Sequence, residues 1–300
     1  MPAAYLHGLT FAGQYSPKTL SNNEIQDQLL QRLFGLSGQV AVVTGAMGRL
    51  GRDYVRTLAE AGARVAALDL AGSPAIFSGL AGGGLPIHTE LVDLTKKSDV
   101  DAAFARLTAT LGAATILVNN AGMGSSPASA GLENGPFEDY PEEAWDTMID
   151  SHLKSTLFAS QAFVRHFRAA GRPAGSIVNV SSTYGVVSPD QAIYEFKRAA
   201  GATFFKPVGY SVAKSGVLNF TRWLAEYGAP LGIRANTLVP GGVREAEHHP
   251  DFVREYERRT PLGRMAGEGD YNGAVLFLAS PASSYMTGAM VIVDGGWTAR

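Results

Sequence analysis

The sequence contains no cysteine among its 300 residues. Disulfide bonds, thiolate metal ligands and thiol nucleophiles are therefore excluded as sources of stability or chemistry. An excess of one charge is also missing, because 25 lysines and arginines stand against 27 aspartates and glutamates, for a formal net charge of −2. Without a basic excess or a long charge run, we expect no nucleic-acid partner.

Long apolar runs are absent as well. No stretch reaches the roughly 18 residues that a membrane span needs, and MPAAYLHGLTFAGQYSPKTL at the start lacks a basic segment followed by an apolar one. We therefore expect a cytoplasmic protein with no membrane partner.

Residues 1–35 predict an arm separate from the main domain. They are polar, with Gly8, Gly13 and Pro17 as breakers, and SNNEIQDQLLQRLF indicates a short helix with its leucines on one side. Either the arm packs on the main domain or on a neighbouring subunit, or it is a partly disordered leader.

From residue 38 onward, short β-branched runs alternate with longer amphipathic stretches. Strand runs that are apolar throughout and separated by helices indicate a parallel sheet covered on both faces. We expect a Rossmann-like, doubly wound α/β fold in a single domain over residues 36–300. The runs are VAVVT, ARVAALD, LPIHTELVDL, ATILVNNAG, GSIVNVSS, IRANTLVP and MVIVDGG.

The stretch TGAMGRLG places Gly45, Gly48 and Gly51 between the first predicted strand and the helix that follows. Glycines in such a turn let backbone N–H groups approach a dinucleotide pyrophosphate, and the start of a helix favours negative charge. Taken alone, this signal is weak. Arg49 in the turn could meet a phosphate; its other interpretation, shared with Arg52, is a solvated helix start.

Asp69 ends the second predicted strand, RVAALD. An acid at this position can accept hydrogen bonds from the adenosine ribose hydroxyls and repels a 2′-phosphate, which favours NAD over NADP as the cofactor. The alternative is an aspartate that caps a helix. The segments VDL (92–94) and NNAG (119–122) end the next two strands, where strand ends line the cofactor crevice.

Together these pieces resemble the short-chain dehydrogenase/reductase family over roughly residues 36–300. The likeness favours bacterial members with an insert before the catalytic tyrosine and a GGW ending, some of which act on sugars. The matching motifs are TGAMGRLG, LD at 68–69, VDL, NNAG, VNVSS, YSVAK at 210–214, PGGV at 240–243 and VDGGW at 293–297.

The glycine spacing departs from the single-domain branch of that family. T-G-x-x-G-x-x-G is typical of its longer, epimerase-like branch, whereas NNAG, PGGV and VDGG are typical of the short branch. Because several later motifs agree, we expect a single-domain member. The resemblance implies that the cofactor contacts Gly45, Gly48, Arg49, Leu50, Gly51, Asp69, Asp93, Leu94, Asn120, Ala121, Gly122, Tyr210, Lys214, Pro240, Gly241 and Val243.

Tyr210 and Lys214 are four residues apart in a strong helix candidate, so their side chains share one face. A lysine ammonium beside a phenol favours the phenolate and lowers the phenol's pKa, which allows the tyrosine to exchange a proton with an alcohol. By resemblance, Lys214 also binds the nicotinamide ribose and Ser182 holds the substrate oxygen. The alternative is a surface tyrosine–lysine pair.

A second tyrosine, Tyr194, competes for the catalytic role, with Arg198 four residues later. An arginine does not replace the compact charge of a lysine, and the sequence around Tyr194 does not match the family. The extra length within 185–209 is then an insertion before Tyr210. We expect it to shape the substrate mouth, or else to form a surface flap or subunit contact.

His152 stands where many family members carry an asparagine that holds a water in the proton relay. Helical spacing places it on one stripe with Trp145, Met148 and Thr156, so it should face inward. It either connects Lys214 to solvent as a relay or is a core histidine bonded to a carbonyl.

The segment 242–262 covers the substrate, by resemblance. Its many charges favour a hydroxylated substrate, although a merely solvated helical segment fits equally well. Glu245 replaces the usual threonine near this position. The adjacent His248 and His249 do not share a helix face, so we expect no metal.

The helix that carries Tyr210 is apolar on more than one side, which predicts burial against a partner in a homodimer or homotetramer. We expect an NAD-dependent oxidoreductase that interconverts a secondary alcohol and a ketone on a sugar- or polyol-like small molecule. The alternatives are an epimerase or dehydratase with tightly bound NAD, a reductase of a steroid or 3-oxoacyl ketone, and a non-catalytic dinucleotide sensor.

Overall fold

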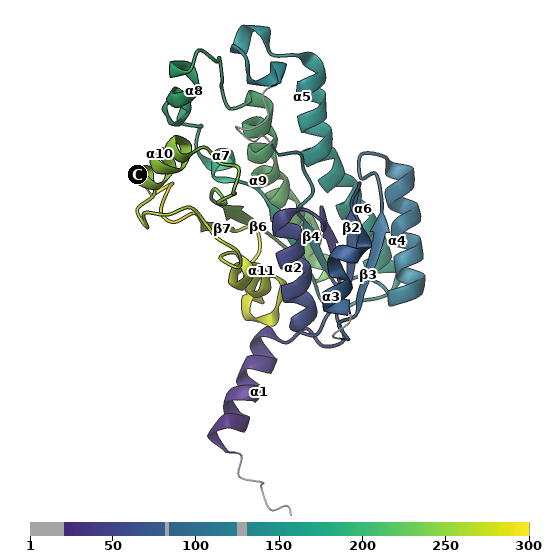
Figure 1. The fold of residues 1–300 in the computed structure, drawn as a ribbon. Coiled ribbons are helices and arrows are strands. Elements are labelled where there is room, and N and C mark those ends of the chain that lie inside the picture. Colours follow the sequence, from purple (N-terminus) through teal and green to yellow (C-terminus); the bar gives the residue numbers. More distant parts are fainter. Residues whose placement is uncertain (1–20, 82–83, 125–130, 300) are drawn as a thin grey trace, which may run out of the picture.

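The computed structural model describes residues 21–81, 84–124 and 131–299. Its centre is one sheet of seven parallel strands in the order β3-β2-β1-β4-β5-β6-β7, with helices on both faces (Figure 1). This confirms the doubly wound fold. The strands are β1 (Val40–Thr44), β2 (Arg64–Asp69), β3 (Ile87–Leu91), β4 (Ile116–Asn119), β5 (Gly175–Val180), β6 (Ile233–Pro240) and β7 (Met290–Val293).

Alternate strand residues point to opposite faces, and both faces of the central strands are apolar. Val43 and Val65 pack with α2 and α11, whereas Val42 and Ala66 pack with α4 and α6. A strand buried on both sides has to be apolar throughout, which explains the runs. The helices are α1 (Asn22–Phe34), α2 (Arg49–Glu60), α3 (Ser78–Ala81), α4 (Lys97–Leu111), α5 (Glu142–Ile149), α6 (Ser155–Ala169), α7 (Thr183–Val186), α8 (Glu195–Ala199), α9 (Val208–Gly228), α10 (Pro250–Arg259) and α11 (Asn272–Ala279).

A third apolar cluster lies apart from the two clusters that cover the faces of the sheet. It joins the insertion before α9 to α10 and the C-terminal segment. The insertion contains a short 3₁₀ turn, Gln191–Tyr194, followed by α8. The clustered side chains are Tyr184, Ile193, Tyr194, Phe204, Phe252, Val253, Tyr256, Met265 and Trp297.

The predicted N-terminal helix is confirmed as α1, which extends away from the body of the molecule (Figure 1). Ser21 and Glu24 form a reciprocal capping box at its start. No residue of α1 is fully buried, and Leu29 and Leu30 are exposed. Leu33 and Phe34 near its end are half-buried, and the helix contacts the 3₁₀ turn Pro281–Ser283. The leader before it, residues 1–20, lies outside the described residues. Across the described part of the chain, no helix combines the length and apolarity needed to cross a membrane.

Candidate active site

A cavity of about 780 Å³ opens at the carboxyl ends of the strands. This is the edge at which doubly wound sheets bind ligands. Its walls include every predicted site residue except Gly51. These are Gly45, Gly48, Arg49, Leu50, Asp69, Asp93, Leu94, Asn120, Ala121, Gly122, His152, Ser182, Tyr210, Lys214, Pro240, Gly241 and Val243.

The glycine turn between β1 and α2 has the shape of a dinucleotide cradle. Gly45 has a φ of +60°, and a Cβ on it would lie 2.8 Å from the Cα of Ala121. A Cβ on Gly51 would lie 2.0 Å from the carbonyl oxygen of Gly45. Gly51 therefore allows α2 to pack against the turn, and it stands behind the cradle instead of lining it.

Asp69 fixes the cradle from the end of β2. Its Oδ2 accepts the N–H of Met47 at 2.8 Å, and its Oδ1 accepts the N–H of Leu70 at 2.8 Å. Each carboxylate oxygen has more than one acceptor site. The same side chain that orients the turn thus still presents acceptors to the cavity, as an adenosine ribose requires.

Arg49 and Glu245 form an ion pair at the cavity wall, with Nη1 and Oε1 3.5 Å apart. The other carboxylate oxygen of Glu245 lies 3.6 Å from Nε2 of His248. Arg49 is therefore not a purely solvated helix start, because it joins the first turn of α2 to the segment after β6. Glu245 also lines the cavity.

A buried chain of hydrogen bonds lies beneath the cavity, and the sequence analysis did not identify it. Asn119 Nδ2 donates to Asn179 Oδ1 at 2.8 Å, and Asn179 Nδ2 donates to Thr221 Oγ1 at 2.9 Å. These bonds link the ends of β4 and β5 to α9. Buried polar networks of this kind fix the relative position of the elements that join them.

Ser182, Tyr210 and Lys214 meet on one side of the cavity. Ser182 follows β5 and caps α7, and its side chain is hydrogen bonded to Tyr210. Lys214 is buried one turn after Tyr210 in α9, and its Nζ donates to the carbonyl oxygen of Val180 at 3.0 Å. The tyrosine and lysine therefore point inward and do not form a surface pair.

Burial affects the protonation of both Tyr210 and Lys214. Burial raises the pKa of Tyr210, while the hydrogen bond with Ser182 acts in the opposite direction. Burial also lowers the pKa of Lys214 to about 8, and its Nζ lies 6.0 Å from the centre of the Tyr210 ring. In the protein alone, burial is the larger of the two influences on the pKa of Tyr210. The lowering expected from the Lys214 ammonium and a bound nicotinamide stays a prediction for the complex with the cofactor.

His152 lies in a π-helical turn, Asp150–Lys154, between α5 and α6. Such turns are rare and are frequent at functional sites. The side chain is buried, as predicted, and its ring meets the Tyr210 ring edge-on at 5.5 Å. Its Nε2 lies 3.1 Å from the carbonyl oxygen of Met123, and Nδ1 has no hydrogen-bond partner among the described residues.

The pKa of His152 is lowered well below 6.5 by burial and, secondarily, by the charge of Lys214. The imidazole is therefore neutral. Because a carbonyl oxygen only accepts hydrogen bonds, Nε2 carries the proton and donates a hydrogen bond to the carbonyl oxygen of Met123. Nδ1 then presents a lone pair toward Gly122, where a Cβ would lie 2.0 Å from it.

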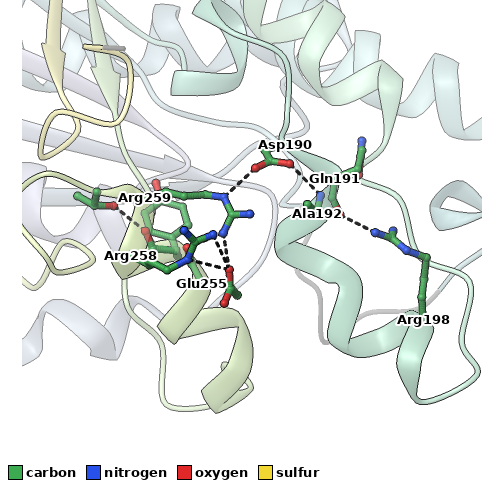
Figure 2. A network of polar contacts seen from close by, with 9 residues as sticks. Asp190, Gln191, Ala192, Arg198, Glu255, Arg258 and Arg259 are labelled. Atoms are coloured by element: carbon green, nitrogen blue, oxygen red, sulfur yellow. Dashed lines mark hydrogen bonds and ion pairs between the residues drawn. The ribbon is translucent and has the colours of Figure 1, made fainter.

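Tyr194, the competing tyrosine, is 1% exposed and stacks on Phe252 of α10 at 5.7 Å. The insertion that carries it is also tied to α10 by Asp190, whose carboxylate lies 2.7 Å from Arg259 (Figure 2). The insertion is therefore not a loose flap, and it forms the cavity wall with Tyr194 and Lys206. The sequence analysis gave Lys206 no role in the site. The feature that could have indicated one is its position shortly before Tyr210, in an insertion rich in aromatic residues.

Among the described residues, no three histidine, aspartate or glutamate side chains gather as metal ligands.

The family model for short chain dehydrogenases matches residues 39–255, so the chain belongs to this family. It is 31% identical over 274 residues to a 2-dehydro-3-deoxy-D-gluconate 5-dehydrogenase of Escherichia coli, covering 89% of this chain and 98% of the relative. It is 33% identical over 266 residues to a 3-alpha-(or 20-beta)-hydroxysteroid dehydrogenase of Mycobacterium tuberculosis, covering 88% and 91%.

The structure superimposes on a gluconate 5-dehydrogenase from Burkholderia cenocepacia, solved with NADP and tartrate, with a TM-score of 0.78. The two are 28% identical, and the match covers 91% of this chain and 99% of that one. The family assignment is thereby confirmed, and the chain is an oxidoreductase that interconverts secondary alcohols and ketones.

Proposed function

We propose that this chain is an NAD-dependent dehydrogenase of a polar, sugar- or polyol-like secondary alcohol. The observation that carries the proposal is the meeting of Ser182, Tyr210 and Lys214 in the same cavity as the glycine cradle and Asp69. Polyhydroxylated acids appear in the names of the Escherichia coli and Burkholderia relatives, which supports a hydroxylated substrate.

Tyr210 exchanges the proton of the substrate hydroxyl at its phenolic oxygen. A nicotinamide cofactor, when bound, would accept the hydride from the carbon that bears this hydroxyl. Ser182, already hydrogen bonded to Tyr210, donates to the substrate oxygen and holds it beside the phenol. In the oxidation direction the Tyr210 phenolate accepts the proton of the substrate hydroxyl, and the positive charge of Lys214 favours that phenolate before the transfer.

His152 supports this arrangement by position. Its proton is engaged with the Met123 carbonyl and its ring packs edge-on against Tyr210. A relay through this ring would require the Met123 bond to break first. We therefore propose that His152 orients Tyr210 and the segment after β4.

NAD is the proposed cofactor because Asp69 presents a carboxylate at the end of β2, where a 2′-phosphate would be repelled. Arg49 could offset that repulsion, but it is paired with Glu245. The Burkholderia relative holds NADP, so the preference of this chain depends on its own residues. The remaining cofactor contacts proposed above all line the cavity except Gly51.

We further propose that residues 36–300 act as one domain that assembles into a homodimer or homotetramer. The outer face of α9 exposes Val212 and the stacked pair Trp223 and Tyr227, whose rings are 5.3 Å apart. Trp223 is 61% exposed. Large apolar side chains gathered on one helix face indicate a protein contact.

The test is the absorbance of NADH when the protein is mixed with NAD and a panel of sugars, sugar acids, polyols, steroids and acyl alcohols. A dehydrogenase forms NADH continuously with at least one of them. An epimerase or dehydratase forms none while it converts its substrate, and a sensor protein binds NAD without converting any member of the panel.

A further inference from the structure

Two stacked rings form a wall of the cavity beside the proposed catalytic tyrosine. Tyr194 comes from the insertion and Phe252 from α10, and both line the cavity although only 1% and 5% of their surfaces are exposed. Their ring centres are 5.7 Å apart and their planes differ by 18°. Tyr210 packs against the apolar cluster to which both rings belong. The wall therefore stands close to the carbon that would react.

Further rings support this wall on the side away from the cavity. Phe204 of the insertion lies 4.8 Å from Tyr194, and Tyr256 of α10 lies 5.9 Å from Phe252. Tyr256 in turn stacks on Trp297 at 4.2 Å. Because protein interiors are close-packed, a ring held between other rings cannot move aside without disturbing its neighbours. The wall is therefore a firm limit to the cavity.

The cavity has to hold a dinucleotide as well as a substrate. The glycine turn and Asp69 follow β1 and β2, whereas Ser182 follows β5, two strands along the sheet from β1. The adenosine part of a dinucleotide belongs at the β1–β2 side. A substrate at Tyr210 is then left with the space between the cofactor and the wall.

We propose that Tyr194 and Phe252 limit the size of the substrate. An alcohol of one ring or one short chain fits between the cofactor and the wall, and a fused-ring alcohol of the steroid type does not. The inference rests on the proposed function, because Tyr210 marks the carbon that reacts. The relatives described above carry the names of a sugar-acid and of a hydroxysteroid dehydrogenase. Family membership therefore leaves the size of the alcohol open, and the insertion and α10 decide it.

The test compares cyclohexanol with decahydronaphthol, its two-ring counterpart, as ligands of the protein in complex with NADH. NADH and an alcohol are both reduced, so they do not react and calorimetry measures binding alone. In an unobstructed site the larger alcohol would bind more tightly, because it buries more apolar surface. In the parent we expect it to bind about tenfold more weakly than cyclohexanol, or weaker still. In Phe252→Ala the order reverses, because the lost ring leaves space.

Phe204→Ala is the matched control. Phe204 is a similarly buried ring of the same cluster, but it does not line the cavity. We expect this variant to keep the order of the parent. Phe252→Leu is a milder change that should shift the ratio of the two dissociation constants part of the way. Thermal melting and NADH binding show that each variant is folded.

The proposal is overturned if neither alcohol binds the parent, or if the parent binds decahydronaphthol as tightly as cyclohexanol. It is also overturned if neither Phe252 variant shifts the ratio, or if Phe204→Ala shifts it as much as Phe252→Ala does. The formation of NADH from NAD and the panel of alcohols tests the dehydrogenase function separately. A size limit in binding without any NADH formation would reject that function and leave the role of the wall in place.

Discussion

Oδ2 of Asp190 lies 2.7 Å from Nε of Arg259, and this ion pair joins the insertion to the last turn of α10 (Figure 2). Both segments contribute side chains to the proposed substrate end of the cavity. The ring of Tyr194 stacks on Phe252 and that of Phe196 on His249, at 5.7 and 4.5 Å. The insertion and α10 thus cover the cavity as one packed unit.

Asp190→Asn should loosen this unit without harming the proton chemistry. The Arg259 side chain is 20% exposed and that of Asp190 46% exposed, so the pair contributes up to about 1 kcal/mol. We expect the substrate KM to rise by about two- to fivefold with kcat nearly unchanged. Steady-state kinetics measures both. Arg258→Gln is the control, because Arg258 is 63% exposed and pairs with Glu255. An equal change in the two variants would show that the ion pair has no role.

Tyr210→Phe should lower kcat by about 10²- to 10⁴-fold, because the variant lacks the group that exchanges the proton. Binding of NAD, followed by quenching of tryptophan fluorescence, should change little. Tyr194→Phe loses a hydroxyl that is bonded to Tyr184 and should retain most of the activity. The roles assigned here are wrong if Tyr194→Phe is the inactive variant and Tyr210→Phe is the active one.

Asp69→Ser should shift the cofactor preference toward NADP. The change removes the negative charge that repels a 2′-phosphate, so the ratio of kcat/KM for NADP to that for NAD should rise by about tenfold or more. Melting temperature should fall slightly, since Asp69 also accepts the N–H groups of Met47 and Leu70. A ratio that stays the same would show that another residue selects the cofactor.

Gly51→Ala should destabilise the protein and weaken NAD binding. The new Cβ would lie 2.0 Å from the Gly45 carbonyl oxygen, and the backbone has to move at a cost of about 1–3 kcal/mol. Gly273→Ala is the control, because it adds a Cβ within α11 that meets nothing within 4 Å, where alanine stabilises a helix. Thermal melting and NAD titration of both variants separate the local clash from a general effect of alanine.

The stability of the protein should depend on pH through His152. Its folded pKa lies well below 6.5, so the unfolded chain binds more protons and stability falls as pH decreases below about 6.5. His152→Asn should reduce that slope by up to about 1.4 kcal/mol per pH unit. The other titratable groups near the His152 ring are the same in both proteins, so they do not contribute to the difference in slope. These groups are Lys214, Lys206 and Tyr210. The free energy of unfolding of both proteins can be measured by chemical denaturation between pH 5 and pH 7.5. Identical slopes of this free energy against pH would contradict the role given to His152.

The sheet could be predicted from the sequence because its strands are short, apolar on both faces and separated by helices. Val40–Thr44 is buried throughout, which a parallel strand under two helix layers requires. The positions of Ser182, Tyr210 and Lys214 were also accessible, since the first follows a strand and the other two share a helix face. Motifs tied to regular elements keep their geometry from one protein to the next.

Other parts of the site depend on tertiary contacts that leave no local pattern. The ordinary 3.6-residue helix expected around His152 contains a π-helical turn there. The pairing of Arg49 with Glu245 joins residues far apart in the sequence, and the effect of burial on Tyr210 depends on the whole cavity. Lys206 was visible as a charge in an aromatic segment, but its distance from Tyr210 is set by how the insertion folds.

The close approach of Gly122 to His152 has a consequence for how the protein could change over time. With a Cβ on residue 122 placed 2.0 Å from the imidazole, a side chain at 122 and a ring at 152 exclude each other. A variant with alanine at 122 would need a smaller group at 152, such as asparagine. The order of such replacements is then constrained: residue 152 has to shrink before residue 122 can grow.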